Sequence, residues 1–153
     1  MVQIISKNRK AWHEYFVEER LEAGIVLTGT EVKSCRDGRV NFKDAYCDFR
    51  NGELYVVQMH ISPYPHAGPH FNHEPERPRK LLMHRRELKR LLGKIKEKGF
   101  TLVPLALYLK GPRIKLEIGL VRGKKLHDKR ESIKQRDADR NLRAAIKEQA
   151  RSQ

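Results

Sequence analysis

The residues of this sequence best suited to chemistry are cations, and they gather in two places. One cluster lies within residues 77–98, where ten side chains are Lys or Arg. The other is GKKLHDKR at residues 123–130, where half of the eight residues are Lys or Arg. Phosphate oxygens need several donors along one surface, because affinity comes from summed charge and released counterions. Both clusters therefore predict contact with a polyanion.

The overall charge points the same way. The 153 residues include 33 Lys and Arg against 19 Asp and Glu, which gives a formal net charge of +14. This excess is larger than solubility requires, and it favours nucleic acid over a membrane surface as the partner. No apolar run approaches the roughly 18 residues of a membrane span, and the N-terminus lacks the pattern of a signal peptide. We expect a cytoplasmic protein without membrane association.

A histidine set gives a weaker signal for metal binding. His66, His70 and His73 have a spacing that could hold a metal ion. They lie in residues 62–80, a proline-rich stretch with no helix or strand pattern to fix ligand geometry. We interpret them as exposed loop imidazoles and expect no metal site.

The sequence favours a binding protein over an enzyme. Its carboxylates are scattered without the spacing of an acid–base pair, and ion pairs with the many cations account for them. No nucleophile motif and no glycine-rich phosphate loop is present, so we expect no cofactor. The two cysteines, Cys35 and Cys47, have no CxxC spacing and are expected to be reduced, packed thiols.

Aromatic side chains could stack on unpaired bases. Most of them lie in strand-like runs, where core packing is the commoner use, whereas the two in the proline-rich stretch are harder to place in a core. The candidates are Tyr15, Tyr46, Phe49, Tyr55, Tyr64 and Phe71.

Three helices are expected to position these residues. Residues 8–15 predict a short helix with Asn8 as its N-cap, and residues 28–38 predict a second one that begins with a capping box. Residues 80–99 predict the longest helix, because large apolar residues recur on one face. That stripe consists of Leu81, Leu88, Leu91, Leu92 and Ile95.

Strand patterns fill most of the remaining sequence up to residue 121. The runs 15–27, 101–110 and 113–121 are rich in apolar and β-branched residues, and residues 44–61 form a hairpin around Asn51-Gly52. About six strands with helices between them predict a mainly β fold with some helix. We expect a small antiparallel barrel and not a βαβ fold.

The sequence changes character near its end. Beyond residue 121 it contains no aromatic residue, no proline and few large apolar residues. Such a segment cannot offset its own ordering entropy by burial. We therefore divide the chain into a barrel domain at residues 1–122 and a basic tail at residues 123–153, which we expect to be disordered when free.

Three long stretches together resemble one family. They are NRKAWHEYFVEERLEAGIVLTGTEVKSCRDGRVNFKDAY (8–46), HEPERPRKLLMHRRELKRLLGKIKEKGFTLVPL (73–105) and GLVRGKKLHDKRESIK (119–134). In this order they resemble the SmpB family, the SsrA-binding proteins that partner tmRNA in bacterial trans-translation. The resemblance covers nearly the whole chain.

The resemblance implies a fold and a partner. The fold would be an antiparallel barrel of the oligonucleotide-binding (OB-like) kind with three helices around it. The protein would bind the tRNA-like domain of tmRNA and deliver it to stalled ribosomes. We expect it to act as a monomer. The family's RNA-binding positions fall on Glu22, Leu82 and His84, and the charge pattern adds Arg79, Lys80, Arg85 and Arg86.

The resemblance also gives the basic tail a role. In this family the tail enters the ribosomal decoding centre of 16S rRNA and becomes helical along the empty mRNA path. Its first residues would then meet rRNA, with the cations on phosphates and the histidine on a base. These residues are Gly123, Lys124, Lys125, His127, Asp128, Lys129 and Arg130.

Two other functions remain open on composition alone. A structural ribosomal protein with a basic extension has the same size and charge. A small metal-dependent nuclease would use the histidines of residues 66–73.

Overall fold

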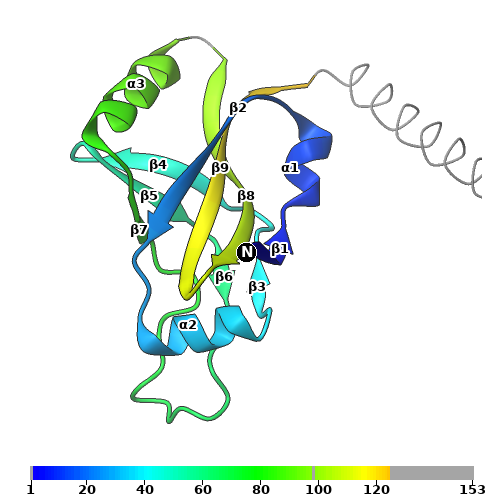
Figure 1. Cartoon of the computed structure of the whole chain (residues 1–153), viewed down its shortest axis with the longest axis vertical. Coiled ribbons are helices and arrows are strands. Elements are labelled where there is room, and N and C mark those ends of the chain that lie inside the picture. Colours follow the sequence, from blue (N-terminus) through cyan, green and yellow to red (C-terminus); the bar gives the residue numbers. More distant parts are fainter. Residues whose placement is uncertain (1, 98, 125–153) are drawn as a thin grey trace, which may run out of the picture.

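The computed structural model describes residues 2–97 and 99–124. In these residues three helices surround a set of antiparallel strands (Figure 1). The strands are β1 (Val2–Lys7), β2 (Tyr15–Ile25), β3 (Val40–Asn41), β4 (Tyr46–Arg50), β5 (Glu53–Val57), β6 (His60–Ile61), β7 (Arg79–Leu82), β8 (Phe100–Lys110) and β9 (Arg113–Gly123). The helices are α1 (Arg9–Glu14), α2 (Gly29–Arg36) and α3 (Arg85–Lys96).

The main sheet closes on itself. Its order is β1-β8-β4-β5-β7-β2-β9, and β9 also pairs with β8 along most of its length. The strands from β8 through β4, β5, β7, β2 and β9 therefore form a closed circuit, with β1 added beside β8. This confirms the mainly β barrel with three helices, which is consistent with an OB-like fold.

Local sequence signals explain the helix starts and the hairpin. Asn8 caps α1 by accepting a hydrogen bond from the Ala11 N–H, and Thr28 and Glu31 form the capping box of α2. Asn51 and Gly52 both have positive φ, as a tight two-residue hairpin turn between β4 and β5 requires. These elements confirm the predictions.

The core lies inside the closed circuit. Alternate residues of the strands, such as Leu54, Leu102 and Leu116, are fully buried there. A smaller apolar cluster lies outside the barrel under α1, where Ala11 packs with Val103, Leu105 and Val121. The helix α1 is thus attached to the outer face of β8 and β9.

The longest helix is shorter than predicted, and a strand takes its first residues. α3 begins at Arg85, whereas residues 79–82 form β7 and pair with both β5 and β2. Leu81 therefore belongs to the barrel core and not to the helix stripe. The cause is tertiary, because the circuit needs one short strand to close it. β1 and β3 are also strands that the sequence patterns did not predict, and the second arm of the predicted hairpin is divided into β5 and β6.

β9 runs two residues past the predicted strand end. Gly123 pairs with Tyr15, and the Lys124 N–H donates to the Glu14 carbonyl at 2.9 Å. The first two residues assigned to the tail thus lie against α1 and β2. Lys125, His127, Asp128, Lys129 and Arg130, like the rest of residues 125–153, lie outside the described residues. None of the described helices is long and apolar enough to cross a membrane.

Candidate nucleic-acid interface

The short strand β7 sorts the predicted RNA-binding residues by direction. Side chains alternate across a strand, so Arg79 and Leu81 point into the barrel while Lys80 and Leu82 point out. The exposed fractions confirm this, with 0% for Arg79 and 53% for Leu82. Adjacent side chains of β7 therefore point to opposite faces of the sheet.

Arg79 cannot belong to a phosphate-binding surface, which corrects the prediction for this residue. Its guanidinium donates to the Glu31 carboxylate and to the carbonyls of Met59, Glu74 and Pro75. The same carboxylate also accepts from Arg77. Buried charges are stable only when they are paired in this way. The cluster ties α2 to the loop that follows β6.

The charges in this cluster survive burial because of their hydrogen bonds. Burial alone would raise the pKa of Glu31, but hydrogen bonds from Arg77, the Thr28 N–H and Arg79 outweigh it and hold the pKa below its usual value. Burial lowers the pKa of Arg79, and the Glu31 carboxylate counters this effect. Glu31 is thus an ionised structural residue.

Glu22 and Leu82 lie on the same outer face of the barrel. Gly24 of β2 pairs with Leu82 of β7, and a Cβ built on Gly24 would lie 3.2 Å from the Leu82 Cβ. Residues two apart in a strand share a face, so Glu22 points to the side of the sheet on which Leu82 lies. Because Gly24 has no side chain, Leu82 can pack directly over it.

The Glu22 carboxylate is held in place by β8. The Tyr108 hydroxyl donates to it, and the Lys110 ammonium lies 3.3 Å away. The Tyr108 hydrogen bond, with help from Lys110, holds the pKa of Glu22 below its usual value. Burial and the Glu22 carboxylate together raise the pKa of Tyr108. Glu22 is therefore an ionised, oriented acceptor with a side chain that is still partly exposed.

His84 stands where β7 passes into α3. It occupies the N-cap position of the helix, yet its side chain makes no capping hydrogen bond. The ring is exposed and follows Leu82 by two residues. Its imidazole is thus directed to the surface and not to the helix backbone.

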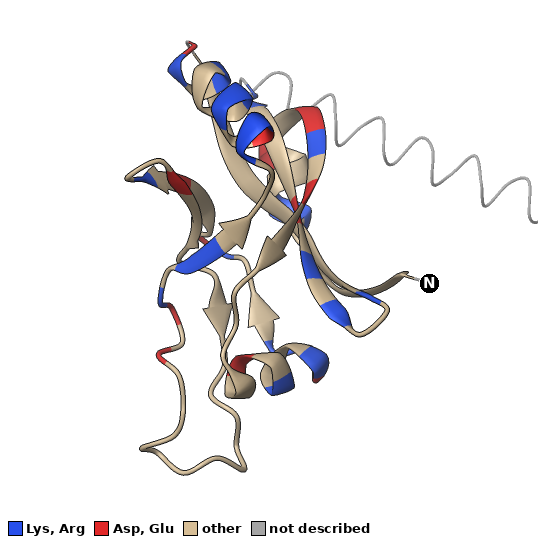
Figure 2. Cartoon of the chain, turned by 60° about the vertical axis from the view of Figure 1, so that its left-hand side comes forward, with Lys and Arg blue, Asp and Glu red and all other residues tan. Residues whose placement is uncertain are grey.

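The first turn of α3 supplies the exposed cations. Arg85 and Arg86 are exposed, and Figure 2 shows Lys and Arg along much of this helix. Other cations of the cluster are already paired: Lys80 with Glu53 at 3.0 Å and Arg90 with Glu19 at 2.6 Å. Lys98 lies outside the described residues. Arg85 and Arg86 are therefore the better candidates for phosphate contacts.

A groove is lined in part by Leu82 and Arg85. It has a volume of about 620 Å³ and runs between the β4–β5 hairpin and the β7–α3 segment. Leu82 and Met83 line it together with Phe49, and Arg85 and Lys80 stand at its polar side. An apolar floor with a basic rim suits a nucleic-acid strand whose bases turn inward and whose phosphates stay outside.

The proline-rich loop uses one of its histidines as a structural link. The ring of His73 makes hydrogen bonds of 2.8 Å with the Thr30 hydroxyl and with the Ile61 carbonyl. His66 instead packs edge-on against Tyr64. Within residues 2–97 and 99–124, no group of three or more His, Cys, Asp or Glu is placed to hold a metal ion.

The end of β9 and the start of the tail have partners that the sequence did not reveal. Arg122 and Lys124 both lie over the ring of Phe16, at 5.6 and 5.1 Å from its centre. The Lys124 ammonium also donates to the Trp12 carbonyl. Tyr108 and Lys110 at Glu22 were missed in the same way, because such pairs are set by strand register and leave no local sequence signal.

Comparisons with known proteins give a consistent result. A family model described as SmpB protein matches residues 5–148. The SsrA-binding protein of Roseiflexus castenholzii is 56% identical over 149 residues, which cover 97% of this chain and 94% of that protein. The SsrA-binding protein of Carboxydothermus hydrogenoformans is 58% identical over 147 residues, which cover 96% of this chain and 98% of that protein.

A solved structure agrees with these relatives. It is described as "tmRNA-SmpB: a journey to the center of the bacterial ribosome". It shares 47% sequence identity with this chain at a TM-score of 0.67, and the match covers 84% of this chain and 93% of that one. The residues matched by the family model, 5–148, include Glu22, Leu82 and His84.

Proposed function

The chain belongs to the SmpB family, and from this premise we propose that it binds the tRNA-like domain of tmRNA and delivers it to stalled ribosomes. It is an RNA-binding protein that acts with the ribosome in trans-translation. It works by binding and not by catalysis, as a monomer, and in the cytoplasm where its partners are.

The observation that carries this proposal is the outer face of β2, β7 and the start of α3. It brings Glu22, Leu82 and His84 to one side of the barrel, with Arg85 and Arg86 beside them. The carboxylate accepts from base amino groups, the leucine and histidine contact base or sugar faces, and the arginines meet phosphates. Glu22 thereby gives selectivity, while the arginines give affinity.

We expect the exposed arginines to set the salt dependence of binding. Each phosphate contact that is lost lowers the slope of log affinity against log salt by about 0.7 to 0.9. Replacing Arg85 and Arg86 by Ala should therefore lower the slope for the tRNA-like domain by about 1.5. Titrations at several salt concentrations measure this slope.

A matched control removes the same charge elsewhere. Arg36 and Arg39 are also exposed, and they lie at the α2 end of the molecule, far from α3 (Figure 1). Their double alanine variant should leave the slope nearly unchanged. Equal losses in both double variants would mean that the protein binds RNA through its overall charge and that the proposed face is wrong.

Gly24 tests the placement of Leu82 without removing any contact residue. In the Gly24→Ala variant the new methyl group should push on Leu82 and weaken tmRNA binding several-fold, at a cost of about 1 kcal/mol in unfolding free energy. Gly29→Ala serves as control, because a Cβ there would meet no atom within 4 Å other than those of its chain neighbours and the backbone of its own helix. Affinity that stays unchanged in Gly24→Ala would remove Leu82 from the RNA-binding face.

A further inference from the structure

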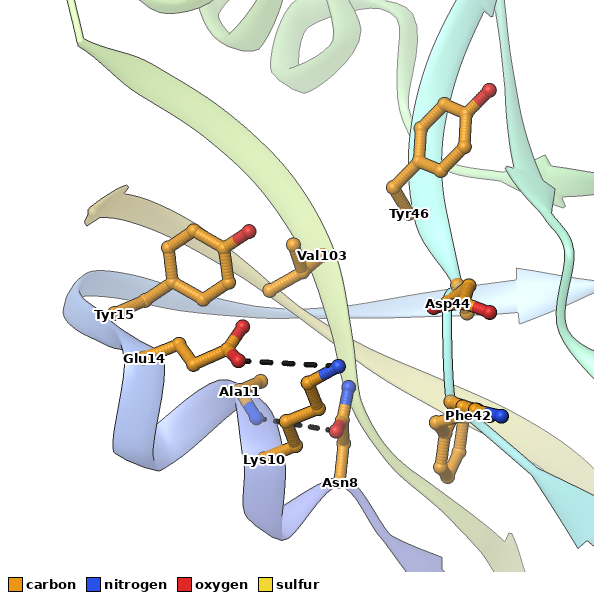
Figure 3. A pocket seen from close by; sticks show the side chains of 11 residues that line it. Asn8, Lys10, Ala11, Glu14, Tyr15, Phe42, Asp44, Tyr46 and Val103 are labelled. Atoms are coloured by element: carbon orange, nitrogen blue, oxygen red, sulfur yellow. Dashed lines mark hydrogen bonds and ion pairs between the residues drawn. The ribbon is translucent and has the colours of Figure 1, made fainter. Parts of the chain in front are cut away.

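A second surface suited to RNA lies between α1 and residues 42–46. It is a pocket of about 330 Å³, within the range of roughly 300–1,000 Å³ that is usual for ligand sites. Figure 3 shows Tyr15 and Tyr46 on two sides of this pocket, with Val103 of β8 between them. Two aromatic rings that flank an apolar floor offer a stacking platform for a flat group.

The walls also offer polar groups. Among the described residues, neither the Asp44 carboxylate nor the hydroxyl groups of Tyr15 and Tyr46 have a hydrogen-bond or ion-pair partner. Lys10 makes only a long contact of 3.9 Å with Glu14. The pocket thus combines stacking surface, hydrogen-bonding groups and a positive charge that is weakly paired.

Cations continue along the rim. A neighbouring pocket of about 210 Å³ shares Lys10 and Lys43 with the first one and adds Lys7 and Arg9. These four cations line a path from the N-terminal end of α1 to the tyrosines. A strand with regularly spaced negative charges fits such a path better than a small neutral ligand does.

The pocket that holds the two tyrosines shares no lining residue with the groove that contains Glu22, although Lys7 of the neighbouring pocket also lines that groove. Lys10 and Glu14 line it from one side of α1, whereas Trp12, on the other side of this helix, lines a groove that contains Glu22. The Glu14 carbonyl accepts from the Lys124 N–H. The pocket therefore lies close to Lys124, the last residue that the structure describes.

We propose that this pocket binds one unstacked nucleotide of ribosomal RNA. The base packs against Tyr46, Asp44 accepts a hydrogen bond from a base amino group or a 2′-hydroxyl, and Lys10 and Lys43 contact the flanking phosphates. The position beside Lys124 assigns the nucleotide to the RNA that the tail meets. The inference rests on the proposed function, because it takes the ribosome as the partner.

The test measures binding of the full chain to two purified partners. One is the tRNA-like domain of tmRNA, and the other is the small ribosomal subunit. Tyr46→Ala should weaken binding to the small subunit about tenfold and leave binding to the tRNA-like domain within about twofold, since stacking of one base is lost. Tyr46→Phe keeps the ring and should retain most of the affinity. Val26→Ala shortens an exposed apolar side chain that does not line this pocket, and it should leave binding to the small subunit within about twofold.

The outcomes separate this inference from the proposed function. If Tyr46→Ala binds the small subunit as tightly as the unchanged chain, or if Tyr46→Phe loses as much as Tyr46→Ala, the stacking site is refuted. A loss only on the tRNA-like domain would refute the assignment to ribosomal RNA. Failure of the unchanged chain to bind the tRNA-like domain would instead overturn the proposed function. Asp44→Asn, which preserves shape, should give a smaller loss of small-subunit binding and guards against misfolding of the tyrosine variants.

Discussion

Deleting residues 125–153 should abolish peptide tagging while leaving tmRNA binding within about twofold. Every residue proposed to contact tmRNA lies in the described barrel, and the sheet is complete at Gly123. The shortened chain should therefore fold and bind the tRNA-like domain. The contacts proposed between the tail and the decoding centre would be lost, so delivery should fail. Tagging in a reconstituted translation system and a binding titration measure the two effects separately.

Lys124 should be retained in this deletion, because it is bound to α1 and Phe16. A suitable control carries a tail of the same composition in scrambled order, which keeps the charge and should not restore tagging. Replacing His127 alone by Ala should give a smaller defect, since only one base contact is lost. If the shortened chain lost tmRNA affinity but still tagged the RNA that it bound, the tail would be one more arm for tmRNA and the division of roles would be wrong.

Replacing Arg79 by Met should lower the free energy of unfolding by about 3–5 kcal/mol, the usual cost of breaking a buried ion pair. The change leaves the Glu31 carboxylate with less compensation and removes the donors to the carbonyls of Met59 and Pro75. Urea unfolding followed by circular dichroism measures the loss. Arg86→Met, a change of the same type at an exposed site, should cost less than about 0.5 kcal/mol.

A double variant tests the reason for this cost. Removing Glu31 as well, as Glu31→Leu with Arg79→Met, should cost less than the sum of the two single changes, because no buried charge of the pair is left alone. A stable Arg79→Met protein with weakened RNA affinity would contradict the structural role. It would restore Arg79 to the RNA-binding surface.

The parts of the fold that the sequence predicted are those that local chemistry decides. Asn8 and the Thr28–Glu31 capping box set the helix starts, because their side chains bond to backbone groups within three residues. Asn51 and Gly52 set the hairpin, because both tolerate positive φ. Alternation in residues 113–121 predicted β9 for a similar reason, since one face of that strand packs inward.

The parts that the sequence did not predict depend on distant partners. Leu81 fits a helical stripe seven residues before Leu88 and fits a strand equally well, and only pairing with β5 and β2 decides between them. Arg79 and Arg85 belong to the same basic run of the sequence. Arg79 is nevertheless buried in an ion pair with Glu31 of α2, whereas Arg85 is exposed. The sequence predicted that the candidate site is basic, but it did not predict which of its cations are exposed to solvent.

Because side chains alternate along β7, deleting one residue just before this strand should harm the protein more than many single substitutions do. The loop before β7 is anchored at His73 and again at Arg77, while its tip near Phe71 is highly exposed. Codons added at the tip need disturb neither anchor. Loss of a single codon between Arg77 and Arg79 would shift β7 by one residue and turn it over. Lys80 and Leu82 would then face the interior, and the core and the RNA-binding face would be lost in one event.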